Sequence, residues 1–285
     1  MKIDNFNDRV AVITGGAAGI GRALAELLQE GGATVVIADL PGETLDATAL
    51  DLGITAIACD VSDATAMDSL AAQVMQRHGK VDLLFNNAGV GFQQSLYKMS
   101  LRDWRWVFDV NFWGVVHGLN SFLPHLTTNP DGAYVVNTAS LLSLYTNSAL
   151  AAYAASKYAV LAVTETLARE MELTDGKVGV TAFCPGPIQT TIYGSLDRRD
   201  QRYGPPPTSD ATDDPVMKAL GHIMDAKRMS ARDAAQIALD AVRNGRFWAI
   251  THPEYTQQIA PEHDALMAEI ERQRSSQALS KAPLA

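Results

Sequence analysis

The chain has 285 residues, of which 47% are apolar and 19% charged, so it holds enough apolar material for one large core. Its formal net charge of −9 argues against a nucleic acid or an anionic membrane surface as a partner. The two cysteines, Cys59 and Cys184, show no metal-ligand spacing, so we expect no metal site. No apolar run approaches the ~20 residues that cross a bilayer, and Met1–Arg9 lacks the apolar stretch of a signal peptide. We therefore expect a cytoplasmic protein with no membrane partner.

Short apolar runs rich in β-branched residues alternate along the chain with longer helical patterns. The predicted strands are Val10–Thr14, Thr34–Ala38, Ile54–Cys59, Val81–Phe85, Ala133–Ala139, Val178–Cys184 and Phe247–Ile250. The predicted helices are Ile20–Glu30, Glu43–Leu52, Ala64–His78, Leu101–Leu126, Leu150–Leu173 and Ala231–Asn244. Most of the strands are apolar throughout, as expected for strands that are covered on both faces. The alternation predicts an α/β fold, a doubly wound Rossmann-type parallel sheet of about seven strands with helices on both faces, in a single domain over residues 1–252.

Two stretches interrupt this alternation. Gln189–Asp214 is polar and contains Gly204-Pro205-Pro206-Pro207, so we expect no regular element there. A loop this long in a compact domain is usually functional or mobile, and we interpret residues 189–229, the lid segment, as a cover for the substrate. Residues 253–285 end in a stretch rich in Ser, Gln, Lys and Ala, and we expect a partly mobile tail.

A glycine-rich turn follows the first predicted strand. Thr14–Gly21 reads TGGAAGIG, has the spacing Gly-x3-Gly-x-Gly and leads directly into a helical pattern. Glycines let the backbone approach a pyrophosphate, and the N-terminus of the helix offers free N–H groups to it. Such a turn is a weak signal by itself, but its position at the first strand–helix junction predicts a dinucleotide site.

Asp39 ends the second predicted strand, where dinucleotide sites place an acidic residue on the ribose hydroxyls. The alternative is a turn or cap residue before Pro41, and we favour the ribose role because both position and residue type fit. A carboxylate there repels a 2′-phosphate, and Ala18 in the glycine turn supplies no compensating cation. We therefore predict NAD, rather than NADP, as the cofactor.

Tyr153 and Lys157 are four residues apart, so on a helix their side chains project from the same face. A free tyrosine titrates near pH ~10, and a neighbouring cation favours its phenolate form. Ser140 follows the strand-like run Ala133–Ala139, where its hydroxyl would hold a carbonyl oxygen between itself and the tyrosine. The three residues predict a site that moves a proton to and from an oxygen atom.

Other candidate side chains have simpler interpretations. Tyr145 and Tyr158 have no lysine four residues further on, so we expect them to serve packing or the pocket wall. His117 and His125 lie on the same predicted helix as Asn111. A proton shuttle is the alternative role for these histidines, but packing in the core or at an interface is favoured.

Through these motifs the chain resembles the short-chain dehydrogenase/reductases, in their compact single-domain branch, over residues 8–252. Besides the turn and the Ser–Tyr–Lys set, the resemblance rests on Asp60-Val61, Asn86-Asn87-Ala88-Gly89, Asn111 and Pro185-Gly186-Pro187-Ile188-Gln189-Thr190. It implies a catalytic set of Asn111, Ser140, Tyr153 and Lys157, in which Asn111 holds a water that links Lys157 to solvent. The cofactor residues that the turn and the resemblance imply are Gly15, Ala18, Gly19, Ile20, Gly21, Asp39, Asp60, Val61, Asn87, Ala88, Gly89, Tyr153, Lys157, Pro185, Gly186, Ile188 and Thr190.

The resemblance also assigns these residues to parts of the cofactor. Asp60 and Val61 would contact the adenine, and Asn87–Gly89 would line the ribose and nicotinamide side. Lys157 would hold the nicotinamide ribose as well as lower the pKa of Tyr153, and Pro185–Thr190 would hold the carboxamide.

Two hypotheses about function follow. The first is an NAD-dependent alcohol dehydrogenase, in which Tyr153 takes the hydroxyl proton while hydride leaves for nicotinamide, or a reductase that works mainly in the opposite direction. The second is a dinucleotide-sensing protein without turnover, which is disfavoured because both Tyr153 and Lys157 are present.

The substrate prediction is a bulky hydrophobic secondary alcohol, aromatic or cyclic, or its ketone. The residues expected to line its pocket are Phe92, Leu142, Asn147, Pro187 and Tyr193. Gly221–Glu254 is also faintly similar to relatives that act on lignin-type aryl alcohols, and steroid-like alcohols remain open. The family suggests a homotetramer or homodimer that pairs through Leu101–Leu126 and Leu150–Leu173.

Overall fold

The computed structural model describes residues 1–285 except 175–176, 208–213, 221–227 and 281–285. The chain divides into two compact units, Met1–Thr251 and His252–Ala285. Among the described residues, no helix combines the length and the apolar content that a membrane span needs.

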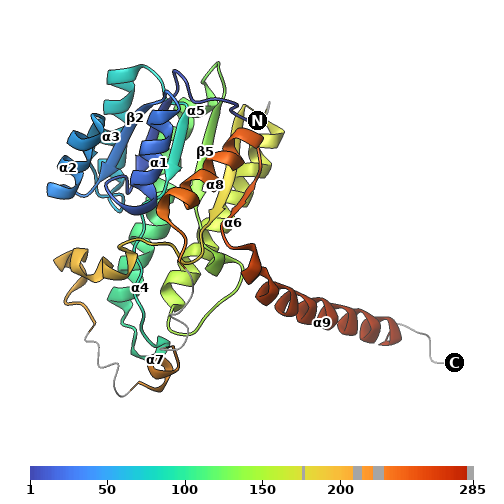
Figure 1. Ribbon diagram of the computed structural model, residues 1–285. Coiled ribbons are helices and arrows are strands. Elements are labelled where there is room, and N and C mark those ends of the chain that lie inside the picture. Colours follow the sequence, from blue (N-terminus) through green and yellow to red (C-terminus); the bar gives the residue numbers. More distant parts are fainter. Residues whose placement is uncertain (175–176, 208–213, 221–227, 281–285) are drawn as a thin grey trace. The chain divides into compact units, whose positions relative to one another are not determined.

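The described part of the first unit contains a seven-stranded sheet in the order β3-β2-β1-β4-β5-β6-β7 (Figure 1). Every neighbouring pair is parallel. The strands are β1 (Val10–Thr14), β2 (Thr34–Asp39), β3 (Thr55–Ala58), β4 (Leu83–Asn86), β5 (Ala133–Thr138), β6 (Val178–Cys184) and β7 (Trp248–Ile250). The predicted doubly wound parallel sheet is confirmed, and each predicted strand is present within two residues at either end.

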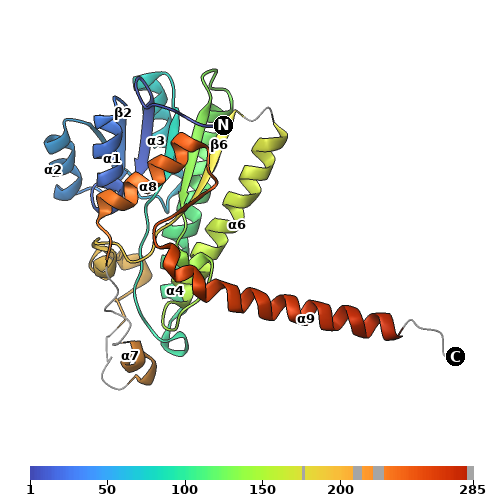
Figure 2. The same cartoon turned by 45° about the vertical axis from the view of Figure 1, so that its right-hand side comes forward.

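Helices lie on both faces of this sheet. The helices in the described part of the first unit are α1 (Gly19–Glu30), α2 (Glu43–Leu52), α3 (Ala64–His78), α4 (Leu101–Phe108), α5 (Gly114–Thr127), α6 (Ala151–Leu173), α7 (Pro215–Leu220) and α8 (Ala231–Asn244). Figures 1 and 2 show α1 and α8 side by side on one face.

Two buried apolar clusters account for the two layers. Ala11 and Ile13 of β1 pack into the cluster that contains α1 and α8. Val10 and Val12, from the same strand, pack into the opposite cluster with α3, α5 and α6. Because successive side chains of a strand point to opposite faces, the all-apolar pattern of β1 requires this double burial.

The predicted helix over Leu101–Leu126 is helical throughout, but it is not a single α-helix. The chain forms α4, then a π-helical turn at Asp109–Trp113, then α5. Asn111 lies in the π turn, fully buried, and its side-chain Oδ1 accepts a hydrogen bond from the Val90 N–H at 2.8 Å. The bond to a loop 21 residues earlier accompanies the wider turn, a feature that is frequent at functional sites.

The expectation of no regular element in Gln189–Asp214 is wrong. The described part of this stretch contains two short 3₁₀ helices, η4 (Ile192–Arg198) and η5 (Gln201–Tyr203). The Asp200 side chain caps η5 by accepting the Arg202 N–H at 2.8 Å. At the base of the lid segment, Ile188 and Met229 form an isolated parallel bridge, so the segment leaves and rejoins the fold at one point.

The second unit contains η6 (Pro253–Gln258) and a long helix, α9 (Ile259–Ser280), that the sequence patterns did not predict. Ion pairs three residues apart, Arg272–Glu269 and Arg274–Glu271, support it. The helix was missed because it lacks an apolar stripe, the signal on which the helix predictions relied.

Candidate active site

A cavity opens at the carboxyl edge of the sheet, where β1, β2, β4 and β5 end. Of the residues predicted to bind the cofactor, those that line it are Gly15, Ala18, Gly19, Ile20, Asp39, Asp60, Val61, Asn87, Ala88, Gly89, Tyr153, Lys157, Pro185 and Thr190. Gly21, Gly186 and Ile188 do not line this cavity, although they lie in the same turns. The fold therefore brings the glycine turn and the Tyr–Lys pair to one space, from segments more than a hundred residues apart.

The glycine turn Thr14–Gly21 has no room for a side chain at Gly15, Gly16 or Gly21. A Cβ on Gly15, whose φ is +64°, would lie 2.7 Å from the Ala88 Cα. A Cβ on Gly21 would lie 2.0 Å from the Gly15 carbonyl oxygen. The N-cap residue of α1, Ala18, makes no side-chain cap bond, so the N–H groups of the first turn keep no side-chain acceptor at that position. Such an end suits an anion.

Asp39, at the end of β2, ties that strand to the glycine turn and lines the cavity. Its Oδ2 accepts the Ala17 N–H at 3.0 Å, and its Oδ1 accepts the Leu40 N–H at 2.8 Å. The bond from the Ala17 N–H places the carboxylate beside the glycine turn. The bond from the Leu40 N–H is the turn interaction that was considered as the alternative role of Asp39. Both features are present together, so the geometry is compatible with a ribose contact from a carboxylate already held in place.

The ends of β1 and β4 are joined by Thr14 and Asn87. The Thr14 hydroxyl accepts the N–H groups of Asn87 at 3.0 Å and Ala88 at 3.1 Å. The Asn87 side-chain N–H groups donate to the carbonyls of Thr14 at 3.0 Å and Gly15 at 3.2 Å. The floor of the cavity is therefore rigid, because each strand end holds its neighbour.

Tyr153 and Lys157 lie one turn apart on α6, as predicted, and both line the cavity. The Lys157 Nζ is 5.8 Å from the centroid of the Tyr153 ring and donates to the Thr138 carbonyl at 2.7 Å. Only 2% of Lys157 is exposed, and this burial lowers the pKa of its ammonium to about 8. A cation that is costly to keep charged therefore lies within reach of the tyrosine.

Ser140 caps the short 3₁₀ helix η3 (Leu141–Ser143) that follows β5. Its Oγ accepts the Leu142 N–H at 3.1 Å and donates to the Pro185 carbonyl at 3.5 Å, which is a long bond. Ser140 is buried and does not line the cavity. A role toward a substrate oxygen would require its hydroxyl to turn away from Pro185.

Asn111 is engaged by protein groups on every side of its amide. Besides accepting the Val90 N–H, it donates to the Val90 carbonyl and to the Ser156 hydroxyl, both at 3.0 Å. Asn111 does not line the cavity. Its side chain positions the loop after β4, and the relay water suggested for it remains a prediction.

The residues predicted for a substrate pocket do not gather around the cavity. Phe92 is buried and stacks on Trp106 with ring centroids 5.8 Å apart, in a cluster with Val107, Ala152 and Tyr203. Leu142, Asn147 and Pro187 are partly buried and do not line the cavity. The Tyr193 side chain lies outside the described part of the structure. Of the two histidines, His117 bonds the Val61 carbonyl at 2.9 Å and stacks on Trp113, which supports the packing interpretation.

The sequence patterns missed several residues that line the cavity. They are Leu40, Cys59, Val90, Trp106, Val110, Thr138, Thr191, Arg198, Asp200, Arg202 and Tyr203. The charged residues among them come from Asp197–Arg202, in which Arg and Asp residues are mixed. This concentration of charge is the sequence feature that could have pointed to them. Among the described residues, no group of three or more His, Cys, Asp or Glu side chains is placed to hold a metal ion.

Comparisons with known proteins point to one family. A family model described as short chain dehydrogenase matches residues 9–201. A crystal structure of a short chain dehydrogenase/reductase from Burkholderia phymatum in complex with NAD superposes with a TM-score of 0.87 and 33% identity, covering 94% of this chain and 97% of that one.

Two curated relatives carry more specific names. The 1-deoxy-11-beta-hydroxypentalenate dehydrogenase of Streptomyces avermitilis is 35% identical over 219 residues, 74% of this chain and 80% of the relative. The 3-oxoacyl-[acyl-carrier-protein] reductase FabG of Thermotoga maritima is 33% identical over 196 residues, 67% of this chain and 78% of the relative.

Proposed function

Because the chain belongs to the short-chain dehydrogenase/reductase family of oxidoreductases, we propose that it interconverts a bulky hydrophobic secondary alcohol and its ketone, with NAD as the hydride acceptor. The observation that carries this proposal is the shared cavity, because one space is lined by the glycine turn and by both Tyr153 and Lys157. The similar structure from Burkholderia phymatum, described as a complex with NAD, supports the choice of cofactor.

The residues present fit a dinucleotide. The glycine turn leaves no space for a Cβ at Gly15 or Gly21, and the N-terminus of α1 has no side-chain cap. The backbone N–H groups of this turn would hold the pyrophosphate, and Asp39 would accept from the ribose hydroxyls. Asp60 and Val61 would border the adenine, and the nicotinamide would lie toward Tyr153, Lys157 and Thr190.

The proposed chemistry is proton transfer by Tyr153. NAD, when bound, supplies the acceptor for the hydride that leaves the carbinol carbon. The Tyr153 phenolate takes the hydroxyl proton, and the Lys157 ammonium, 5.8 Å from the ring centroid, favours that phenolate electrostatically. Ser140 would hydrogen-bond the substrate oxygen once its hydroxyl turns from the Pro185 carbonyl. In the reverse direction Tyr153 acts as the acid.

Apolar side chains support a hydrophobic substrate. Val90, Trp106, Val110 and Ile192 line the same cavity as Tyr153. A relative named as a hydroxypentalenate dehydrogenase supports the oxidative direction. The lid segment and the residues on either side of Ser140 are the proposed remainder of the substrate site.

The test is the appearance of NADH absorbance at 340 nm with purified protein and a panel of aryl, lignin-model, steroid and cyclic secondary alcohols. We expect turnover of one class with NAD and much weaker turnover with NADP, because the Asp39 carboxylate repels a 2′-phosphate. A preference for NADP would show that the role given to Asp39 is wrong. Tight NADH binding with no turnover in either direction would favour the dinucleotide-sensing alternative.

A reductase that works from ketone to alcohol is the second candidate, favoured by the similarity to the 3-oxoacyl-[acyl-carrier-protein] reductase. The two candidates differ in the ratio of kcat/KM for the alcohol with NAD to kcat/KM for the ketone with NADH. The dehydrogenase proposal requires measurable alcohol oxidation at mildly alkaline pH.

We also propose that the protein is a cytoplasmic homotetramer or homodimer. The large apolar side chains exposed on the helices expected to pair are Leu101 of α4, Trp113 of the π turn, and Tyr158 and Leu173 of α6. Light scattering coupled to size-exclusion chromatography would distinguish the two assemblies, and a monomer would contradict both.

A further inference from the structure

We propose that Arg202, in η5 (Gln201–Tyr203), is a positioning residue for the adenine end of the dinucleotide. This inference rests on the proposed function, because it takes the cavity to be a dinucleotide site. The part of that cavity lined by Asp60 and Val61 would hold the adenine, and the sequence motifs assigned only residues of the sheet edge to it.

Arg202 connects the lid segment to the adenine end directly. Its Nη2 donates to the Asp60 Oδ2 at 2.8 Å and to the Ser62 Oγ at 2.6 Å. Arg202 lines the same cavity as Asp39, Asp60 and Val61. The guanidinium therefore borders the space in which Asp60 and Val61 would meet the adenine.

The backbone that carries Arg202 is held without help from this ion pair. Arg199 forms a buried ion pair with Asp103 of α4, at 2.6 Å, and its guanidinium lies 5.2 Å from the Trp106 ring centroid. The Tyr203 hydroxyl donates to Asp109 at 2.9 Å, and the Tyr203 ring is buried. These flanking contacts fix the segment on both sides of Arg202.

Stability is a weak explanation for the Arg202–Asp60 pair. The two side chains are 47% and 30% exposed, and pairs this open to water add little to folding because water competes for both charges. The neighbouring Arg199–Asp103 pair is 2% and 5% exposed and already supplies the attachment of the lid segment. The position of Arg202 at the cavity wall is better explained by a ligand.

The hydrogen-bond capacity of Asp60 leaves room for one more donor. Its Oδ1 already accepts the N–H of Ser62 at 3.0 Å and the Ser62 hydroxyl at 2.5 Å. Its Oδ2 accepts Arg202 and keeps one free lone pair among these contacts, which suits a single N–H of a purine amino group. Burial raises the pKa of the Asp60 carboxyl, but the Ser62 and Arg202 bonds outweigh it, so the group stays an acceptor at neutral pH.

The guanidinium also has the right chemistry for a purine. It is planar and permanently charged, and it already lies 4.8 Å from the Tyr203 ring centroid. A planar cation is attracted to the face of an aromatic ring, and its unused N–H groups can donate to ring nitrogens. Lysine shares the charge but has no planar group.

The test compares the dissociation constants of three probes, NADH, ADP-ribose and reduced nicotinamide mononucleotide, for the wild type and for Arg202→Ala. We expect the substitution to weaken NADH and ADP-ribose about tenfold each and to leave the mononucleotide unchanged, since only the first two carry adenine. Arg202→Lys should recover only part of the loss. Arg232→Ala, which breaks an exposed ion pair with Glu30, is the matched control and should bind all three probes like the wild type.

Each other outcome has a distinct meaning. Unchanged ADP-ribose affinity in Arg202→Ala would overturn the inference and leave the proposed function standing, provided that the wild type binds NADH. Equal losses for all three probes would also overturn it, because Arg202 would then act on the whole lid segment. A wild type that binds neither NADH nor ADP-ribose would overturn the proposed function together with the inference. Thermal melting of each variant checks that the fold is retained.

Discussion

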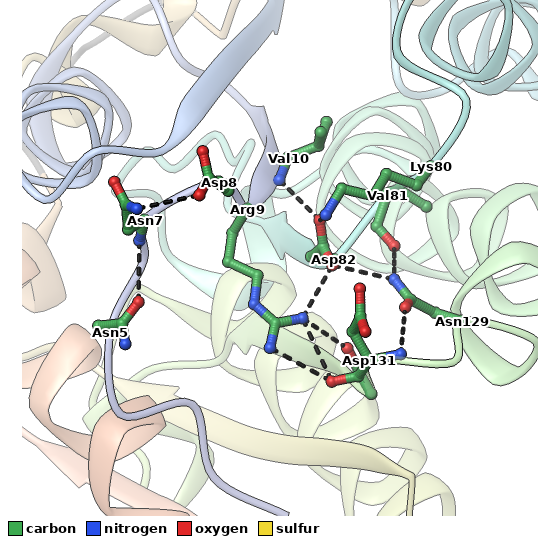
Figure 3. Close-up of polar contacts among 11 residues, drawn as sticks. Asn5, Asn7, Asp8, Arg9, Val10, Lys80, Val81, Asp82, Asn129 and Asp131 are labelled. Carbon is green, nitrogen blue, oxygen red and sulfur yellow. Dashed lines mark hydrogen bonds and ion pairs between the residues drawn. The ribbon is translucent and has the colours of Figure 1, made fainter.

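The two edges of the sheet treat a buried charge in opposite ways. At the amino edge, where β1, β4 and β5 begin, Asp82 is fully buried and its carboxylate accepts bonds from the Val10 N–H at 2.8 Å, Arg9 at 2.9 Å and Asn129 at 3.0 Å (Figure 3). At the carboxyl edge, Lys157 is also buried, and among the described residues its ammonium donates a hydrogen bond to the Thr138 carbonyl.

The pKa values of these two groups record the difference. Burial raises the pKa of Asp82, but the bonds from Val10, Arg9, Asn129 and Lys80 outweigh it and the net shift is downward. Burial lowers the pKa of Lys157 to about 8. The amino edge therefore stabilises its charge and with it the fold, whereas the carboxyl edge keeps a costly charge beside Tyr153, where the proposed chemistry uses it.

The largest expected effect is on turnover at the carboxyl edge, in a variant whose stability should not change. Tyr153→Phe should lower turnover about a thousandfold, because it removes the group that accepts and returns the proton. The dissociation constant of NADH and the melting temperature should stay near those of the wild type. Tyr158→Phe, on the same helix, is the control and should keep full turnover; near-normal turnover of the Tyr153 variant would remove that residue from the mechanism.

The next effect tests the amino edge. Asp82→Asn should lower the free energy of unfolding by about 3 kcal/mol at pH 7, because the buried bonds to Arg9 lose their charged acceptor. Urea unfolding measures this change, and NADH affinity should not alter. Asp131→Asn, at an exposed side chain in the same region, is the matched control.

The difference in the free energy of unfolding between the wild type and Asp82→Asn should depend on pH. Since the folded pKa of Asp82 lies below its unfolded value of about 3.9, its contribution is present above that pH and is lost as pH falls through the folded pKa. The gap between wild type and Asp82→Asn should therefore shrink in acid. A gap that is small and constant with pH would contradict the stabilising role given to the amino edge.

Lys157→Met should raise the free energy of unfolding, whereas Asp82→Asn should lower it. The folded pKa of about 8 lies below the usual 10.5, so the charged form is penalised in the folded state. The variant should be more stable than the wild type by roughly 2 kcal/mol at pH 7, after allowance for the lost bond to Thr138. The gap should narrow as pH rises from 8 toward 10.5, because the folded protein is then no longer charged at this position.

Chemical unfolding of both proteins between pH 7 and pH 9.5 measures this trend. The exposed Lys177→Met is the control and should show no such narrowing. If Lys157→Met were less stable than the wild type at pH 7, the claim that the buried charge of Lys157 destabilises the folded protein would be contradicted.

The smallest expected effect concerns cofactor choice at the same edge. Asp39→Ala should reduce the preference for NAD over NADP about tenfold, since one unfavourable charge contact with a 2′-phosphate is removed. The ratio of kcat/KM for the two cofactors measures it. Asp46→Ala, an exposed carboxylate on α2, should leave the ratio unchanged, and an equal change in both variants would attribute the preference to overall charge.

Local patterns predicted the parts of the molecule in which local sequence decides the structure. β1 and β6 were predicted to the residue because apolar runs buried on two faces leave one choice of element. The glycine turn and the Tyr153–Lys157 spacing are local too, so the two halves of the site were recognisable before their meeting at one cavity was known.

The missed features depend on distant partners. The π turn at Asn111 is tied to Val90, and η4 and η5 are tied to α4 through Arg199 and Asp103, which are 96 residues apart. Arg202 reaches Asp60 across 142 residues. No local pattern encodes such pairs, which is why Gln189–Asp214 was predicted to be irregular and its cavity-lining arginines were not assigned.

The most direct test of the central claim, that the carboxyl edge is a dinucleotide site with its proton-transfer group at one end, is a crystal structure of the protein with NADH. The account predicts the pyrophosphate on the glycine turn, the adenine beside Asp60 and Arg202, and the nicotinamide beside Tyr153 and Lys157. A dinucleotide bound elsewhere, or a cavity without it in crystals grown at saturating NADH, would contradict the account.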